Sequence, residues 1–578
     1  MRRNFALLVI AVYLGTACAT APKPGSSTLT NPGGTVDPTE AAQSGRTLVT
    51  SVRVEPKTVA ARVVGQNLSI GSFFTRRIFN ADLALLDDQG EPVPYLAEAL
   101  PRLNTSDWKV SSDGTMETTY HLKPNLSWHN GSPLTADDFV FSWRVYGTPE
   151  LGSAASPPIS LIDEVQAPDP RTIVIRWTRP YLAAGALQSL GPGATGLPPL
   201  PRAILGPALE SGADALLNNP YWTTEFVGLG PYRLDEWEPG AFLEASAFDR
   251  HALGPPKISR IKIMFVGDGN TTIAGMLAGD ILLAADSGVN EQQAAELLRQ
   301  WPGAKSFSQA ALWQAVHFQS RPEFASPPAL QDLRVRRALA YAVDKAAIND
   351  VVFEGWFLIS DSMFPPTGEV GKAANAAVTK YSLDLKQSAQ LMGEAGFTKG
   401  ADGVYASPSA GRLSAELMIS AGGQTLMTAV ASGWRQAGYE IEESATPAAL
   451  AQDVQTRSSF PGMQIITSAL GESGIINMTT NNIPRPENNW RSGGSSVSYA
   501  GYATPEMDRL VAAYATALAP QDRIQAAVNI AKQVDHDFPA IPLFFPTTVW
   551  VYASKLSGPK STTTESNLAW NVQDWELQ

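Results

Sequence analysis

Short alternating strands and amphipathic helices follow one another along most of the chain. Residues 172–177 alternate apolar and polar side chains, which predicts a half-buried β-strand. Residues 334–348 repeat apolar side chains at helical spacing, which predicts a helix with one buried face. A second helix is predicted to begin at Thr504 as N-cap, with Pro505 in its first turn. This interleaving predicts an α/β fold.

A βαβ-like unit is predicted between these two helices. Residues 415–419 read as a strand, residues 424–436 as a helix that ends before Gly438, and residues 439–441 as the return strand. No internal repeat with a period of 20–50 residues is present, which excludes solenoid and propeller folds.

The N-terminal segment has the pattern of a signal peptide. Arg2 and Arg3 precede an apolar run over residues 5–14, and small residues lead to Cys18. This run is shorter than the ~20 apolar residues that a helix needs to cross a bilayer. We therefore predict a signal peptide over residues 1–18.

Cys18 is the only cysteine of the chain, so no intramolecular disulfide and no cysteine-based zinc site can form. Its position at the end of the apolar segment resembles a bacterial lipobox, with Gly15 where lipoboxes usually carry Leu. The resemblance implies that Cys18 carries lipid, and the alternative is plain cleavage. Residues 19–45, rich in Pro, Gly, Ser and Thr, are predicted to be a flexible linker.

Composition narrows the class of protein. A chain of 578 residues is long enough for more than one lobe. Hydrophobic residues make up 44% and charged residues 17%, which is ordinary for a globular protein, and 43 Pro and 47 Gly predict many turns. The net charge of −12 and the lack of a basic cluster disfavour a nucleic-acid partner.

Residues 122–143 form the most specific passage of the sequence. They predict a strand, a tight turn at Asn130-Gly131 and a helix with Thr135 as N-cap and Asp138 as the capping-box acid. Further characteristic segments are 90–98, 227–234, 332–345, 501–508 and 539–544. In this order, the segments closely resemble the bacterial extracellular solute-binding proteins of family 5, which include dipeptide-, oligopeptide- and nickel-binding receptors.

The resemblance implies a periplasmic-binding-protein-like type II fold of class α/β. Two main lobes would enclose a ligand cleft, and a further lobe would be inserted into the first. The expected ranges are 46–82, 205–306 and 541–578 for lobe I, 83–204 for the inserted lobe II and 307–540 for lobe III.

The same resemblance implies a function without catalysis. We expect an exported substrate-binding lipoprotein, anchored by lipid at the periplasmic or extracellular face of the cell envelope. It would capture a peptide-like small solute and deliver it to the permease subunits of an ABC importer. We expect a monomer that needs no cofactor.

The matching stretch of the large lobe departs from peptide receptors of the family. Those receptors typically pair an aspartate there with the α-amino group of the ligand, whereas residues 469–474 offer only Glu472. Glu472 is either a longer substitute or a solvated surface charge. Recognition of a free peptide N-terminus therefore stays open.

Other candidate ligand contacts are aromatic or polar. Trp490 and Arg491 follow an Asn-rich loop and could offer an aromatic wall and a cation for a carboxylate. Gln319 stands where the family usually has Asn, and either touches ligand or bonds the hinge backbone. For Trp313 and Trp356, packing in the core is the alternative to ligand contact.

Other functions are weighed against this expectation. No two of the five histidines have metal-ligand spacing, so no bare metal site is predicted, although a chelated metal or another non-peptide solute is an alternative ligand. A sensory receptor would have the same sequence features. Ser106 and Lys109 match Ser-x-x-Lys, but the other motifs of such hydrolases and a Gly-x-Ser-x-Gly elbow are lacking, which argues against a secreted hydrolase.

Substitution of Cys18 tests the anchor. Cys18→Ser removes the only thiol that could carry lipid, so the protein is expected to move from the membrane pellet to the soluble fraction on cell fractionation. A wild-type protein that is already soluble would contradict the predicted anchor.

Overall fold

The computed structural model describes residues 47–62, 64, 73–151, 157–191, 196–310, 312–420, 422–447, 450, 453–469, 472–490, 495–563 and 566–578. The chain divides into Met1–Ser44 and Gly45–Gln578, and the described residues belong to the second unit. The predicted signal peptide, Cys18 and the predicted linker lie outside them.

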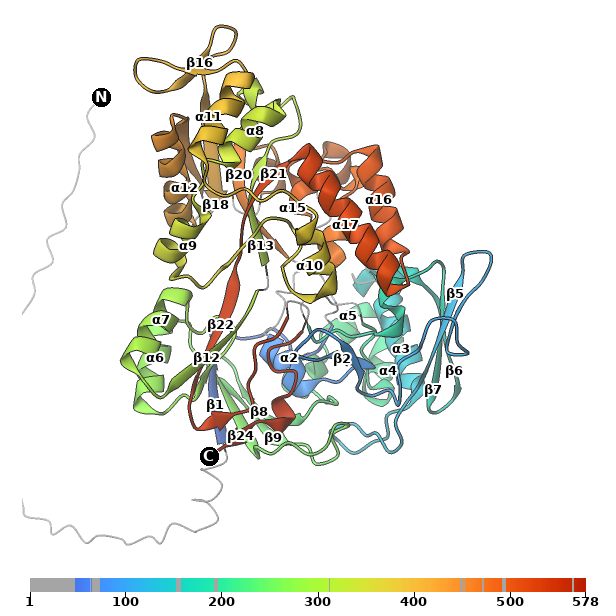
Figure 1. Ribbon diagram of the computed structural model, residues 1–578. Helices are drawn as coiled ribbons and strands as arrows, with labels where there is room; N and C mark the ends of the chain where they lie inside the picture. The colour runs from blue at the N-terminus through green and yellow to red at the C-terminus, as the bar shows by residue number, and fades with distance from the viewer. Residues whose placement is uncertain are drawn as a thin grey trace, which may run out of the picture. The chain divides into compact units, whose positions relative to one another are not determined.

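A seven-stranded sheet collects strands from the beginning, middle and end of the described chain (Figure 1). In spatial order they are β12 (Ala304–Ala310), β22 (Thr547–Ala553), β11 (Leu283–Ala284), β1 (Thr47–Val52), β10 (Arg260–Phe265), β9 (Phe242–Ala247) and β8 (Tyr232–Glu238). β1 is parallel to β10 and β11, while β22 is antiparallel to β11 and β12. The sheet draws on the three ranges expected for lobe I.

Buried Arg77 connects an early segment of this part of the protein to the C-terminal segment by hydrogen bonds. It lies on α2 (Phe73–Phe79), and its guanidinium donates to the Trp570 carbonyl at 2.9 Å, the Tyr95 hydroxyl at 3.0 Å and Gln573 Oε1 at 2.7 Å. Burial lowers the pKa of Arg77, but these acceptors satisfy its donors. Helices α6 (Gly269–Ala278) and α7 (Glu291–Gln300) contribute a further apolar cluster with β22.

A second, four-stranded sheet lies within residues 108–177. Its order is β4 (Trp108–Val110), β5 (Met116–His121), β7 (Thr172–Trp177) and β6 (Ile162–Asp169), and α3 (Ala136–Gly147) packs against β6. β7 confirms the predicted strand with alternating burial.

Asp138 is the capping acid that the sequence predicts. Its carboxylate accepts the Thr135 N–H at 3.0 Å, and it also accepts the Arg202 N–H at 3.1 Å from α4 (Arg202–Glu210). Gly131 has a φ of 90°, as the predicted turn requires.

The third large part contains a six-stranded mixed sheet. Its order is β14 (Leu358–Ile359), β21 (Ala540–Phe545), β13 (Leu312–Phe318), β20 (Met463–Ala469), β18 (Ser414–Ser420) and β19 (Glu440–Thr446). One apolar cluster holds residues of α8 (Leu333–Ala340), α9 (Lys345–Phe353), α11 (Leu385–Glu394) and α12 (Gln424–Ala437). The other holds residues of α10 (Gly368–Ala376), α16 (Pro505–Ala515) and α17 (Pro520–Asp537). The helices therefore cover both faces of the sheet (Figure 1).

Two sequence predictions for this part are confirmed. β18, α12 and β19 form the βαβ unit with parallel strands, and Gly438 ends the helix in the left-handed conformation. α16 begins at Pro505, and the Thr504 hydroxyl accepts the Met507 N–H at 3.1 Å.

The prediction of one helix over residues 334–348 is wrong. The chain forms α8 and α9 instead, because Asp344 caps a new helix by accepting the Ala347 N–H at 3.0 Å. Val335, Leu339 and Val343 are nevertheless all buried in one cluster. The apolar periodicity therefore identifies the buried face and does not show the break.

The chain passes twice between the seven-stranded and the six-stranded sheet, from β12 to β13 and from β21 to β22. β12 ends at Ala310 and β13 begins at Leu312, while β21 ends at Phe545 and β22 begins at Thr547 after Pro546. The partners stay paired on both sides, β12 with β22 and β13 with β21. The predicted lobe boundaries at 306/307 and 540/541 stay predictions, and these changes of sheet lie a few residues beyond them.

The remaining elements are short. They are β2 (Ala84–Leu86), β3 (Pro92–Pro94), α5 (Ala213–Leu217), β15 (Thr398–Lys399), β16 (Tyr405–Ser407), β17 (Gly411–Arg412), α13 (Val454–Ser458), α14 (Glu472–Ile476), α15 (Ser496–Tyr499), β23 (Leu556–Ser557) and β24 (Glu576–Leu577).

Asp82 is a fully buried carboxyl group between α2 and β2. Neither oxygen has a hydrogen bond of good geometry to the described part of the chain. Burial raises the pKa of Asp82 to about 7, although Ser189 beside it acts in the opposite direction. The folded state therefore holds a proton that the unfolded state releases above its ordinary pKa of 3.8.

The stability of Asp82→Asn relative to wild type is expected to increase as the pH rises. The raised pKa of Asp82 means that its contribution to stability is present below pH 3.8 and is lost as the pH approaches 7. Between pH 4.5 and 8.5 the unfolding free energy of the variant should gain about 3 kcal/mol relative to wild type. Urea unfolding at both pH values measures this gain, with exposed Asp163→Asn as control. Equal gains in both variants would contradict the assignment.

Candidate functional site

The loop that carries Trp490 has an unusual backbone. Asn489 and Trp490 have φ values of 52° and 59°, which place two consecutive residues with side chains in the left-handed region. The Trp490 N–H donates to the Arg485 carbonyl at 2.8 Å, and Asn488 Oδ1 accepts the Arg485 N–H at 2.9 Å. Such strain persists where the surrounding structure holds it, and it is concentrated at functional sites.

The indole of Trp490 is only partly buried. It meets the Phe324 ring edge-on, with 6.2 Å between the ring centres. None of the hydrophobic clusters formed by the described residues includes Trp490. Its ligand contact stays a prediction, and part of the residue is exposed to solvent.

Gln319 bonds to the backbone of residues 458 and 460, which do not join the two large sheets, so the predicted bond to the hinge stays a prediction. Its amide donates to the carbonyls of Ser458 at 3.0 Å and Phe460 at 2.9 Å. Its Oε1 accepts the Arg321 backbone N–H at 3.2 Å and Arg321 Nε at 3.1 Å. With both ends of the amide used, Gln319 supports the strand end of β13, and its ligand contact stays a prediction.

Trp313 lies in the interior with 2% of its surface exposed. Its indole N–H donates to Ser360 Oγ at 3.0 Å, and its ring meets the His317 imidazole edge-on. Burial lowers the pKa of His317 to about 3, so this imidazole is neutral. These are the contacts of a core residue, and the ligand role of Trp313 stays a prediction.

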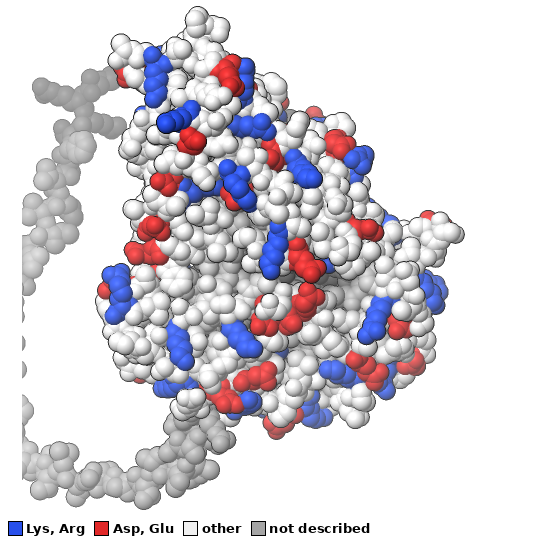
Figure 2. Space-filling view, in the orientation of Figure 1, with Lys and Arg blue, Asp and Glu red and all other residues white. Residues whose placement is uncertain are grey.

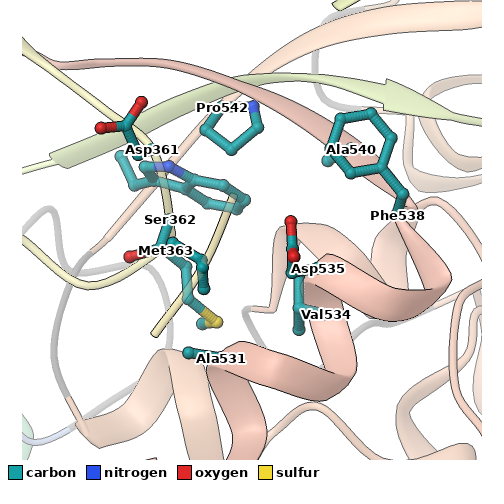
Figure 3. A pocket seen from close by; sticks show the side chains of 11 residues that line it. Asp361, Ser362, Met363, Ala531, Val534, Asp535, Phe538, Ala540 and Pro542 are labelled. Atoms are coloured by element: carbon teal, nitrogen blue, oxygen red, sulfur yellow. The ribbon is translucent and has the colours of Figure 1, made fainter. Parts of the chain in front are cut away.

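A cavity of about 20 Å³ lies beside Trp313 (Figure 3). This volume has room for about one water molecule and not for a peptide. Asp361, at one side of it, pairs with Lys345 and Lys380 at 3.1 Å each. Asp535, across from it, accepts the Thr379 hydroxyl at 2.9 Å. Both acids are already satisfied, so the cavity is not the ligand site.

Trp356 packs between two bodies of the protein. It packs against two apolar clusters. One belongs to the six-stranded sheet and includes Phe357, and the other includes Leu297 of α7. Nearby, Gln292 of α7 donates to the Val352 carbonyl of α9 at 3.4 Å. Trp356 is therefore a contact between the two large parts, and its ligand role stays a prediction.

Two predicted residues have no described side chain. Glu472 is the first residue of α14, and only its backbone is described. Arg491 lies outside the described residues. The structure thus brings Gln319 and Trp490 into one neighbourhood through Arg321 and Phe324, while Trp313 and Trp356 lie in apolar clusters.

Arg321 is a central residue that sequence reasoning missed. An isolated arginine in the segment Arg321-Pro322-Glu323 has no pattern that indicates burial. Its side chain is nevertheless 7% exposed and bonds carbonyls of distant segments.

Charge is distributed evenly over the face of the molecule in Figure 2. Lysine and arginine side chains lie among aspartate and glutamate, and no large area carries one sign. Among the described residues, no group of three or more His, Cys, Asp or Glu is placed to hold a metal ion. In the same part of the chain, no helix is both long and apolar enough to cross a membrane.

Comparison with known proteins gives the family. The model of the bacterial extracellular solute-binding proteins, family 5 Middle, matches residues 98–493. The chain belongs to the bacterial extracellular solute-binding proteins of family 5. This confirms the resemblance drawn from the ordered segments, of which 122–143, 227–234 and 332–345 lie within the matched range.

Solved structures confirm the fold expected of a family 5 protein. The NikA protein of Brucella suis in complex with Fe(III)-EDTA matches with a TM-score of 0.73 and 17% identity, over 92% of this chain and 100% of that one. The oligopeptide-binding protein of Thermus thermophilus with a pentapeptide matches with a TM-score of 0.66 and 20% identity, over 92% and 96%. The predicted periplasmic-binding-protein fold of class α/β is therefore correct.

Sequence relatives of this family 5 protein include the dipeptide-binding protein of Escherichia coli. It is 27% identical over 334 residues, which are 54% of this chain and 56% of the relative. The chain spans about half the length of the first curated relatives it matches.

Replacement of Gln319 is expected to destabilise this family 5 protein. Gln319→Leu leaves the Phe460 carbonyl and the backbone N–H and Nε of Arg321 without this partner, at a cost of about 2–4 kcal/mol, while the Ser458 carbonyl keeps its bond from Arg321 Nη2. Gln390→Leu, at an exposed position on α11, should change stability by less than about 0.5 kcal/mol. Chemical denaturation compares the two; equal stabilities would contradict the buried network.

Proposed function

We propose that the protein is the substrate-binding component of an ABC importer. It captures a peptide-like small solute between the part built on the seven-stranded sheet and the part built on the six-stranded sheet. The observation that carries this proposal is the pair of strands that joins the two sheets, within a fold shared with family 5 proteins. Two bodies joined by a few extended segments can close around a ligand by bending at those segments. The closed form would then deliver the solute to the permease subunits without chemical change.

Peptide is the ligand class that we place first. The relative from Escherichia coli is named a dipeptide-binding protein, and the solved structure from Thermus thermophilus holds a pentapeptide. A chelated metal is the second candidate, because the solved NikZ of Campylobacter jejuni holds Ni(L-His); it matches with a TM-score of 0.69 and 21% identity, over 92% of this chain and 99% of that one. The described side chains offer no metal cluster, so a metal would be bound through its chelator.

The proposed ligand contacts centre on Trp490. Its partly exposed indole offers an aromatic wall, and Arg491 next to it supplies a cation for a carboxylate. Glu472, at the start of α14, is the proposed acid for a ligand cation. Gln319 supports this region from within through its bonds to the backbone.

The site of action follows from the N-terminal sequence. We propose export to the cell envelope, cleavage before Cys18 and attachment to the membrane through lipid on that residue. A linker of 27 residues over positions 19–45 would let an anchored monomer reach the permease.

Loss of the Trp490 ring tests the function. The protein is purified from its host, its bound solute is identified by native mass spectrometry, and that solute is titrated by calorimetry. Trp490→Ala should weaken binding about tenfold, because a buried aromatic contact is worth ~1–2 kcal/mol, while Trp490→Phe retains most of it. Trp143→Ala, at a partly buried tryptophan on α3, is the control. Unchanged affinity in Trp490→Ala removes it from the site, and a preparation that binds neither peptides nor chelated metal contradicts the function.

A further inference from the structure

We propose that Arg321 is the positioning residue that holds the Trp490 loop, residues 484–490, at both of its ends and so sets the place of the Trp490 indole. The proposal rests on the proposed function in so far as Trp490 contacts ligand. The anchoring itself concerns only this chain and can be tested without a ligand.

The first observation concerns the hydrogen-bond acceptors of the Arg321 guanidinium. It donates from Nη1 to the Pro484 carbonyl at 2.8 Å, from Nε to Gln319 Oε1 at 3.1 Å and from Nη2 to the Ser458 carbonyl. It forms no ion pair with the described acids. A buried arginine whose donors go to backbone carbonyls of separate segments fixes those segments relative to one another.

The second observation is that the loop is held at its start and at its end. The Pro484 carbonyl is the first backbone group of the loop. At the other end, the Trp490 indole meets the Phe324 ring, and the Arg321 guanidinium lies 4.9 Å from the centre of that same ring. One side chain therefore contacts the loop directly at Pro484 and indirectly, through Phe324, at Trp490.

The third observation is that the loop itself is strained. Asn489 and Trp490 both adopt the left-handed conformation, which asparagine tolerates but which is unfavourable for the bulky side chain of Trp490. Internal bonds at Arg485 and Asn488 shape the turn, but they do not connect it to the β13 region. Without an outside anchor, relief of this strain would let the indole move.

The stem of Arg321 is enclosed by a close backbone approach. Gly501 has a φ of 85°, and a Cβ on it would lie 2.6 Å from Arg321 Cγ. Next to it, the Ser320 N–H donates to the Ala500 carbonyl at 2.8 Å. The absence of a side chain at Gly501 leaves room for the stem, so the guanidinium is directed to one place.

Lysine cannot replace this arrangement. The planar guanidinium presents donors in three directions at once and lies against an aromatic ring, whereas an ammonium is a single point on a flexible stem. Arg321→Lys therefore retains charge and most of the apolar stem while it removes the connection between Ser458, Gln319 and Pro484. Arg336→Lys is the matched control, because Arg336 also donates to carbonyls, of Leu330, Gln331 and Asp537, and lies over the ring of Phe318.

The decisive measurement is the ¹⁹F resonance of Trp490 in the full chain labelled with 5-fluorotryptophan, assigned by Trp490→Phe. Arg321→Lys should shift or broaden the Trp490 resonance and leave that of Trp434, buried on α12, in place. Arg336→Lys should leave the Trp490 resonance as in wild type. An unchanged Trp490 resonance in folded Arg321→Lys overturns the proposal, as does an equal change in Arg336→Lys.

A second measurement separates this proposal from the proposed function. A tripeptide mixture is titrated into wild type, Trp490→Ala, Arg321→Lys and the double variant. We expect a loss of about tenfold in each single variant and no further loss in the double variant, because both changes remove the same contact. If Trp490→Ala binds like wild type, the ligand role of Trp490 fails while the resonance still decides the anchoring. If both single losses multiply in the double variant, Arg321 does not act through Trp490, and the proposal fails.

Discussion

Backbone hydrogen bonding across the two joining strand pairs is the constraint on which the rest of the structure depends. β22 lies between β12 and β11 in one sheet, and β21 lies between β14 and β13 in the other. Each sheet thus receives interior strands that continue into its neighbour, and neither can lose them without exposing unpaired backbone groups. Pro546 lacks an N–H and interrupts the ladder where the chain changes sheet. The two sheets are consequently continuous in chain, yet each has its own ladder of backbone hydrogen bonds.

Two buried arginines around these sheets have hydrogen-bond partners of the same kind. Arg77 and Arg321 send their donors to carbonyls, hydroxyls and amides, and neither pairs with a carboxylate among the described residues. A carbonyl acceptor belongs to a fixed backbone, whereas a carboxylate has rotamers of its own. Arg77 therefore fixes the C-terminal segment against α2, and Arg321 fixes loops around the end of β13. Asp82 differs, because burial raises its pKa to about 7 and no donor among the described residues bonds to it with good geometry.

The sequence predicts local structure better than it predicts the ligand contacts, and the reason is physical. Thr504 and Gly438 begin or end helices through bonds within a few residues, so their roles can be recognised from the local sequence. Burial depends on distant segments. Trp313 and Trp490 are both tryptophans, yet Trp313 is buried in the core and Trp490 is partly exposed. Gln319 likewise depends on Ser458 and Phe460, which lie far along the chain.

The interior place of β22 has a consequence for how the protein is made. The strand is formed by Thr547–Ala553, near the end of the sequence, and both of its neighbours are synthesised far earlier. During translation this sheet therefore has a gap between β12 and β11 until residues 547–553 have been synthesised. A sheet with an unfilled interior position gains little cooperative stability. The topology therefore delays completion of this sheet until a segment more than two hundred residues beyond β12 has been added.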